Sequence, residues 1–354
     1  MRIIEDVKLD YDDVLIRPKR STLVSRKDVD LTRTYKFLHS KKVWTGIPII
    51  SANMESSGTF GVAKVLAKYD MICALHKFHS IEELKKNLPE LNKPKNVAYT
   101  LGIRKEDFEK AKEVKKLGLD KYFDFVCLDV PNAYLEAVVK KVVELRKMFK
   151  DHIIIAGNLV SNEIAEELLI RGADIVKVGI GPGSACITRM KTGVGYPQLS
   201  AIMECSDAAH GISNEQGYGL VIGDGGLVYP ADVSKAFCGG ADFVMSGSLF
   251  SGFKQSGGEL VEKDGKMFKK YVGSSSSYFM KKNYKKVDTH RASEGRVLEI
   301  PYKGDMEDFL QDLLGSLRST ATYIGARRLK EFSKRASFIR VSKQLNNSLE
   351  RYEV

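Results

Sequence analysis

A glycine-rich stretch from Lys177 to Gln198 contains the residues best suited to covalent chemistry. The apolar positions that lead into it are typical of a buried strand, and the chain then continues as GPGS (181–184). Such a loop lets the backbone turn sharply and approach a ligand closely. Cys186 supplies a thiol there, and the hydroxyl of Thr188 follows two residues later. We interpret Cys186 as a nucleophile presented at the end of a strand; the alternative is a surface loop with an incidental cysteine.

Short apolar runs recur along the chain and indicate the elements that must position this loop. Amphipathic helical patterns lie between several of them, at 81–91, 105–117, 133–149 and 162–169, with Ser80 and Ser161 as expected N-caps. The alternation predicts an α/β fold, a (β/α)8 TIM barrel, rather than an open doubly wound sheet, because no GxGxxG follows an early strand. The segments GADIVKVGIG (172–181) and GADFVMSGSL (240–249) indicate that one helix-to-strand unit occurs twice. The apolar runs lie at 47–53, 72–78, 96–102, 125–130, 153–158, 175–181, 220–225 and 243–249.

The ends of these runs are polar or glycine-rich, and the carboxyl ends of the strands are where such barrels place their function. The last two runs end in Asp224-Gly225-Gly226 and Gly247-Ser248. Small residues leave main-chain N–H groups open to an anion, so these ends predict phosphate-binding loops. The alternative is that the glycines only form tight turns.

The whole chain (1–354) is interpreted as one catalytic domain with additions. These are an N-terminal arm (1–45), a hairpin and flap excursion (254–300) that turns at Asp264-Gly265, and a C-terminal tail (327–354). A final helix is expected over 305–317.

Composition limits the cellular compartment and the classes of ligand that we expect for this protein. No apolar run is long enough for a membrane span and no secretory segment is evident, so a cytoplasmic protein is expected. The five cysteines form no CxxC, which argues for a reducing compartment and against structural zinc. The net charge of +11 is explained more simply by phosphate-bearing ligands than by nucleic acid, although a nucleotide-sensing or nucleic-acid-associated scaffold is an alternative.

Eight long motifs follow one another along the chain: KLDYDDVLIRPKRSTLVSRKDVDLTR (8–33), IISANM (49–54), LDVPN (128–132), AGNLVSNE (156–163), GPGSACITRMKTGVGYPQLSAIMECSDAAHG (181–211), IGDGG (222–226), YKGDMEDFLQDLLGSLRSTATYIGA (302–326) and FIRV (338–341). In sequence and order they resemble the GMP reductases of the inosine-monophosphate dehydrogenase superfamily. The alternative enzyme is the sister dehydrogenase, which oxidises IMP with NAD. Its regulatory domains usually follow the second strand, where this chain has no room for them.

The resemblance implies NADPH-dependent reduction of GMP to IMP with release of ammonia, in purine salvage. Cys186 would attack purine C2 and form a thioimidate, while Thr188 and Glu294 would handle the proton of the departing amine. The resemblance further implies that the substrate is bound by Ser184, Asp224, Gly225, Gly226, Gly247, Ser248, Gly273, Ser274, Ser275, Arg291, Ser293 and Gly295.

The resemblance also implies sites for a cofactor, a cation and other subunits. A monovalent cation (K+) would be held by carbonyls of Gly181, Gly183 and Cys186, with Arg189. The family forms homotetramers, so some cofactor contacts would come from a neighbouring subunit. The cofactor positions implied are Ser25, Arg26, Lys77, Asp129, Val130, Pro131, Ile180, Gly181, Ser274, His290, Arg291, Ser319, Thr320, Ala321 and Thr322.

Some positions depart from the usual pattern of this family. The flap carries Lys285, Lys286, Thr289 and His290, which affects expectations for cofactor contacts more than for the chemistry. The segment ISNEQGYG (212–219), which includes Asn214 to Gly217, is longer than usual and suggests no function. Gly223, Ser248 and Ser274 are further replacements.

Overall fold

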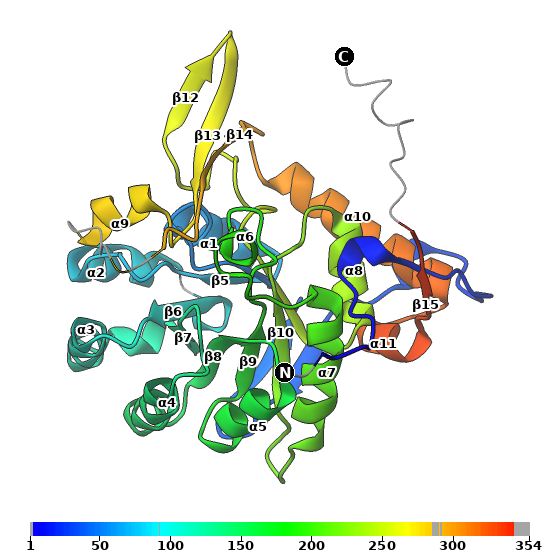
Figure 1. Ribbon diagram of the computed structural model, residues 1–354, viewed down its shortest axis with the longest axis horizontal. Helices are drawn as coiled ribbons and strands as arrows, with labels where there is room; N and C mark the ends of the chain where they lie inside the picture. Colours follow the sequence, from blue (N-terminus) through cyan, green and yellow to red (C-terminus); the bar gives the residue numbers. More distant parts are fainter. Residues whose placement is uncertain (1–2, 92, 285–289, 291, 343–354) are drawn as a thin grey trace.

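The computed structural model describes residues 3–91, 93–284, 290 and 292–342. A closed barrel of eight parallel strands lies at its centre, which confirms the predicted (β/α)8 fold (Figure 1). Each strand ends before its apolar run does, or within a residue of that point, because the residues that follow turn into loops. The strands in barrel order are β4 (Ile49–Ser51), β5 (Ile72–Ala74), β6 (Val97–Leu101), β7 (Phe125–Asp129), β8 (Ile153–Leu159), β9 (Ile175–Val178), β10 (Leu220–Asp224) and β11 (Phe243–Ser246), which pairs with β4.

Helices connect successive strands and surround the barrel (Figure 1). Ser80 is confirmed as a cap, because its hydroxyl accepts from Glu83 N while the Glu83 carboxylate accepts from Ser80 N. Ser161 is likewise confirmed as the N-cap residue of its helix, although its side chain makes no capping hydrogen bond. The larger helices are α1 (Phe60–Lys68), α2 (Ile81–Leu91), α3 (Lys105–Lys116), α4 (Glu136–Met148), α5 (Asn162–Ile170), α7 (Gln198–Gly211), α8 (Pro230–Cys238) and α10 (Glu307–Ile324).

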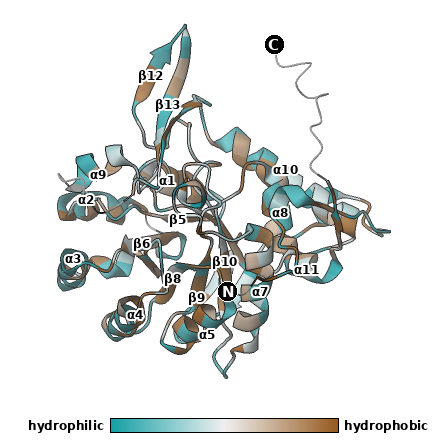
Figure 2. Cartoon of the chain, in the orientation of Figure 1, coloured by the Kyte–Doolittle hydropathy of each residue, from teal (hydrophilic) through white to brown (hydrophobic). Residues whose placement is uncertain are grey.

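Two packed layers bury the strands on both faces. One set of strand residues, including Ile50, Phe125, Ile175 and Met245, fills the barrel interior, and the alternate set packs against the helices. Figure 2 shows this as apolar strands at the centre and polar stretches on the outer helices. None of the described helices is long and apolar enough to cross a membrane.

The repeated GAD segments occupy equivalent places in the barrel. Asp174 precedes β9 and accepts from Ile154 N at 2.9 Å, while Asp242 precedes β11 and accepts from Val221 N at 3.0 Å. Each buried carboxylate therefore bonds to the main chain of the preceding strand. This shared bond gives the repeated aspartate a structural reason.

An aromatic hairpin closes the N-terminal end of the barrel. Strands β2 (Arg33–Lys36) and β3 (Val43–Gly46) place Tyr35 and Trp44 against Phe243, with ring centroids 4.8 and 5.2 Å away. The longer segment 212–219 packs here too, since Asn214 Nδ2 donates to Leu38 O at 2.9 Å and Tyr218 pairs with Phe37. This segment thus supports the end of the barrel opposite the cavity described below.

Further elements extend the barrel. The predicted turn at Asp264 (φ 49°) and Gly265 (φ 72°) joins β12 (Leu260–Lys263) to β13 (Lys266–Val272), and β14 (Val297–Pro301) completes a sheet that projects outward in Figure 1. The last long helix, predicted to end at 317, continues to Ile324, because Ala321 and Ile324 extend its buried face as far as the left-handed Gly325. The remaining elements are η1 (Tyr11–Asp13), β1 (Val14–Ile16), η2 (Arg26–Asp28), η3 (Pro94–Asn96), η4 (Leu119–Tyr122), α6 (Thr188–Thr192), α9 (Ser277–Tyr284), η5 (Leu329–Glu331), α11 (Phe332–Arg335) and β15 (Phe338–Arg340), which pairs with β1.

Candidate active site

A cavity of about 610 Å³ lies at the carboxyl ends of the barrel strands. Its wall combines strand ends with the loop after β9, the segment after β13 and Glu294. It extends from Cys186 past Asp129 to Lys77 and Arg104. The volume is in the range of ordinary small-molecule sites.

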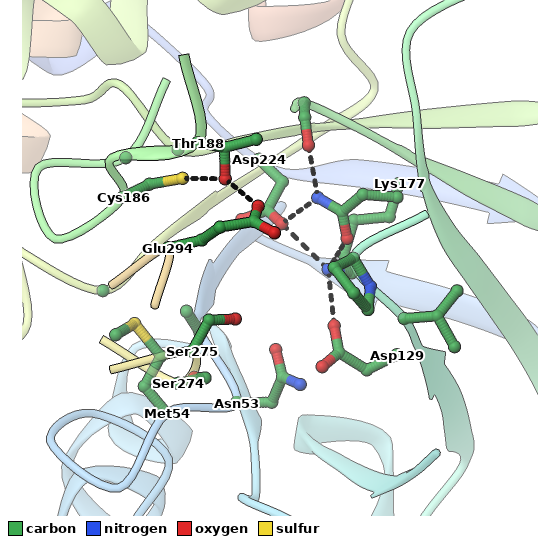
Figure 3. Close-up of a pocket in the computed structure, with 18 of the residues that line it drawn as sticks. Asn53, Met54, Asp129, Lys177, Cys186, Thr188, Asp224, Ser274, Ser275 and Glu294 are labelled. Atoms are coloured by element: carbon green, nitrogen blue, oxygen red, sulfur yellow. Dashed lines mark hydrogen bonds and ion pairs between the residues drawn. The ribbon is translucent and has the colours of Figure 1, made fainter. Parts of the chain in front are cut away.

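A thiol, a hydroxyl and a carboxylate form a connected chain at this cavity. Cys186 Sγ lies 3.1 Å from Thr188 Oγ1, and Thr188 Oγ1 donates to Glu294 Oε2 at 2.7 Å (Figure 3). Main-chain bonds hold the two loops together, since Ile187 N donates to Glu294 O at 2.8 Å and Cys186 pairs with Gly295. The structure thus brings together three predicted catalytic residues from segments 106 residues apart.

The direction of these bonds defines a path for one proton. A threonine hydroxyl has a single hydrogen, which Thr188 donates to Glu294. The hydrogen between Sγ and Oγ1 must then belong to the Cys186 thiol. The arrangement can pass a proton from the thiol through Thr188 to Glu294, which leaves a nucleophilic thiolate.

Cys186 differs from the other cysteines in its surroundings. It is half-buried and lines the cavity, whereas burial raises the pKa of the Cys73, Cys127, Cys205 and Cys238 thiols to about 12. A buried thiol with a raised pKa is inert at neutral pH. Cys186 is therefore the cysteine suited to nucleophilic work.

Lys177, which sequence reasoning missed, lines the cavity and joins two predicted site residues, Asp129 and Asp224. Lys177 is 2% exposed, and its Nζ donates to Asp129 Oδ1 and Asp224 Oδ2, each at 2.9 Å, and to Asn158 Oδ1. Burial opposes the lysine charge, but Asp129 and Asp224 outweigh it and raise the pKa of Lys177. Burial likewise disfavours the Asp129 carboxylate, yet Lys177 holds the pKa of Asp129 below its usual value. The available signal was a lysine inside an otherwise apolar strand, IVKV.

The glycine-rich ends of the last two strands form part of the cavity wall. Gly225 (φ 87°) and Gly226 (φ 76°) have left-handed backbones, and a Cβ on Gly247 would lie 2.6 Å from Met54 Sδ and 2.8 Å from Tyr271 Oη. Only glycine fits these positions without rearrangement. Tyr271 was also missed by sequence reasoning, although its buried hydroxyl donates to Met54 Sδ at 3.5 Å beside this loop.

Most residues predicted for the substrate line this cavity, and some flank it. Ser293 Oγ accepts from Ser277 N at 3.0 Å, Gly273 N donates to Arg296 O at 3.0 Å, and Gly295 pairs with Cys186, so these three support the wall. Arg291 lies outside the described residues. The predicted residues that line the cavity are Ser184, Asp224, Gly225, Gly226, Gly247, Ser248, Ser274 and Ser275.

The residues predicted for the cofactor fall into two groups. Ser25 and Arg26, at η2, and Ser319 to Thr322, on α10, are absent from the cavity wall; α10 packs against η2 instead. His290 is described as an exposed turn residue, while Lys285, Lys286 and Thr289 lie outside the described residues. The predicted cofactor residues on the wall are Lys77, Asp129, Val130, Pro131, Ile180, Gly181 and Ser274.

The residues predicted for a cation have clear structural partners. Gly183 O accepts from Cys186 N at 2.9 Å, and Arg189 donates to Asp10 Oδ2 at 2.8 Å and to Tyr196 O at 2.6 Å. Arg189 thereby ties the loop to the N-terminal arm. Within the described residues, no cluster of histidine, cysteine and carboxylate side chains could hold a metal ion.

Comparison with known proteins agrees with this architecture. Residues 8–348 match the family described as IMP dehydrogenase / GMP reductase domain. The chain is 51% identical to GMP reductase 2 of Homo sapiens over 347 residues, covering 97% of both chains. It is 50% identical to GMP reductases of Shigella boydii serotype 18 and Escherichia coli O81 over 348 residues, covering 98% of each chain. This chain is an enzyme of the IMP dehydrogenase / GMP reductase family.

Proposed function

We propose that this chain catalyses the NADPH-dependent reductive deamination of GMP to IMP and ammonia. The observation that carries the proposal is the hydrogen-bonded chain of Cys186, Thr188 and Glu294 at the cavity. Removal of an amino group needs a nucleophile for the carbon and a proton for the nitrogen, and this chain can supply both. Relatives that are about half identical over nearly their whole length carry the name GMP reductase.

In the first half-reaction the thiol proton is transferred to Glu294 and then to the departing amine. The proton passes from Cys186 through Thr188 to Glu294, and the thiolate forms a bond to purine C2. As the C2–N bond breaks, protonated Glu294 returns the proton through Thr188, and the amine leaves as ammonia. The products are a thioimidate on Cys186 and an ionised Glu294, so the proton count balances.

The second half-reaction replaces sulfur by hydrogen. When bound, NADPH supplies the hydride to C2, and the bonding pair of C2–Sγ returns to Cys186 as thiolate. Exclusion of water from the cavity would protect the thioimidate, because hydrolysis would compete with hydride transfer. The Cys186 thiolate then takes up a proton from solvent before the next cycle, because the first proton left with ammonia.

Binding roles follow from charge and shape. Asp224 would accept from the ribose hydroxyls of GMP, since no hydrogen bond among the described residues ends on its Oδ1. The small residues at 225–226 and 247–248 would surround the phosphate. The cavity continues to Lys77, which suits the cofactor, and Asp129 to Pro131 would hold its nicotinamide end.

We also propose contributions from other subunits and from a cation. Ser25, Arg26 and Ser319 to Thr322 would reach the cofactor of a neighbouring chain in a homotetramer. Main-chain carbonyls of Gly181, Gly183 and Cys186, beside Arg189, offer the oxygen ligands that suit K+. Added K+ should raise the melting temperature and the rate more than Li+ does, and equal effects would argue against this cation site.

A single assay tests the reaction. Purified protein with GMP and NADPH should oxidise NADPH and release IMP and ammonia in equal amounts, and guanosine should be a poor substrate. Cys186→Ala should abolish turnover but keep GMP binding within about an order of magnitude. NADH formation from IMP and NAD, without GMP reduction, would instead assign the dehydrogenase reaction.

A further inference from the structure

One buried lysine joins the two sides of the proposed active site. Lys177 comes from β9, while its acceptors Asp129 and Asp224 end β7 and β10 (Figure 3). Asn158 completes the cluster, since it accepts from Lys177 and donates to Asp224 Oδ2 at 2.8 Å and to Gly179 O at 2.7 Å. Asp129 faces the proposed cofactor, and Asp224 faces the proposed substrate. One ammonium group therefore holds both carboxylates in place.

The cluster depends on this single positive charge. With Lys177 charged and both carboxylates ionised, the three side chains have a net charge of −1. Without the ammonium, two carboxylates would be close together in a partly dehydrated cavity, and one would tend to take up a proton. The buried position makes that repulsion costly, because water can screen it only weakly.

Other titratable groups near the cluster do not replace this charge. Burial raises the pKa of the Cys127 thiol to about 12 and raises the pKa of the Tyr11 and Tyr271 hydroxyls, so these groups stay neutral. Lys77 acts on Asp129 from a greater distance, and Asn53, which also lowers the pKa of that carboxyl, carries no charge. Among the described residues, Lys177 is the cation that bonds directly to both carboxylates.

We propose that Lys177 is a positioning residue that couples the two binding sites: its ammonium group orients the Asp224 carboxylate for the substrate and also balances the charge of Asp129 on the cofactor side. The proposal rests on the proposed function. Lys177 and Asn158 both donate to Oδ2 of Asp224, so that Oδ1 remains for a ligand hydroxyl. A change on the cofactor side of the cluster should therefore alter GMP binding.

The test is a double-mutant cycle measured by direct GMP binding. Lys177→Met should weaken GMP binding about 10- to 100-fold, the scale of a lost charge-assisted hydrogen bond. It should also make GMP affinity depend on pH more strongly than in the native chain, because one of the two unpaired carboxylates would tend to take up a proton. Lys177→Arg, which keeps the charge, should not strengthen that dependence.

The second arm restores the charge balance. Lys177→Met combined with Asp129→Asn leaves one carboxylate and the native net charge of −1. Lys177→Met should therefore cost less GMP affinity in the Asp129→Asn background than in the native chain. Equal costs in both backgrounds would overturn the coupling. If Lys177→Met alone fails to fold, folding of the double variant supports the proposal, and its failure to fold overturns it.

A matched control separates this effect from the general loss of a buried lysine. Lys269 is also buried, but its Nζ donates to Ser256 O at 2.6 Å, and it does not line the cavity. Lys269→Met should lower stability without changing GMP affinity or its pH dependence. If native protein does not bind GMP, the proposed function fails; if it binds GMP and the cycle is additive, only the coupling fails.

Discussion

Individual side chains in the cavity have roles that can be separated by their hydrogen bonds. Glu294→Gln cannot take up or return the thiol proton, although it keeps a similar shape and an oxygen for Thr188. We expect GMP reduction to fall by roughly 10²- to 10⁴-fold, the scale of a lost general acid or base. Steady-state kinetics with GMP and NADPH measure this, and NADPH binding should remain largely intact.

The double variant tests whether the path is shared. Because Thr188 and Glu294 serve one proton, Thr188→Ala with Glu294→Gln should cost little more than the worse single change. Fully multiplicative losses would mean that the residues act independently. Glu299→Gln is the matched control, since Glu299 lies on β14 and pairs with Lys263 at the surface.

His76 should make the free energy of unfolding depend on pH on the acid side. Burial first, and then the positive charges of His79 and Lys110, lower the pKa of His76 from 6.5 to about 3. A group with a lowered folded pKa contributes stability above pH 6.5 and loses it as the pH falls below 6.5. His76→Gln should therefore make the free energy of unfolding less sensitive to pH on the acid side, as measured by urea denaturation at a series of pH values.

His210 should behave in the opposite way and provides the comparison. Burial opposes its charge, but the 2.8 Å bond to Asp242 outweighs burial and raises the pKa of His210 above 6.5. Its contribution is complete below pH 6.5 and is lost as the pH rises through the folded pKa. His210→Gln should remove that loss. If both histidine variants changed the same side of the pH curve, the assignments would be wrong.

At the scale of an element, α10 offers two glycines with opposite expectations. Gly325 ends the helix at φ 71°, where a Cβ would lie 3.2 Å from Arg20 O, while Gly315 lies inside the helix with open space around it. Gly325→Ala should lower the free energy of unfolding by about 1 kcal/mol or more, because side chains disfavour left-handed backbone.

The same substitution within the helix should have the other sign. Gly315→Ala should raise the free energy of unfolding by up to about 1 kcal/mol, through helix propensity and a less flexible unfolded chain. Chemical denaturation of the two variants measures both effects. A loss of stability at both positions would show that the Gly315 face of α10 is occupied in the folded protein.

At the scale of the whole molecule, the aromatic residues that stabilise the barrel lie at one end and the candidate active site lies at the other. Trp44 is buried in the aromatic closure at the N-terminal end, and the cavity lies at the other end. Trp44→Ala should lower the free energy of unfolding by about 3–5 kcal/mol, while GMP affinity of the folded protein stays unchanged. Val43→Ala on the same strand is the control, because Val43 is 59% exposed and its change should stay within about 0.5 kcal/mol.

The sequence by itself determined the features that depend on local pattern. Apolar runs followed by polar ends predicted the barrel and the loop with Cys186 and Thr188, and Asp264-Gly265 predicted the hairpin turn. Glu294 was predicted from the family resemblance, and the structure brings it to Thr188. These features depend on backbone preferences or on long motifs, and both can be recognised in a short stretch of sequence.

Only the tertiary structure decided how distant residues combine. In the sequence, Lys177 is an unexplained lysine within an apolar strand. In the structure, β7, β8 and β10 bring Asp129, Asn158 and Asp224 to its ammonium group. The structure likewise placed 212–219 at the end opposite the cavity and left Ser319 to Thr322 away from the cavity wall. A buried charge is stable only with partners, and those partners are set by strand order and register, which no local stretch of sequence contains.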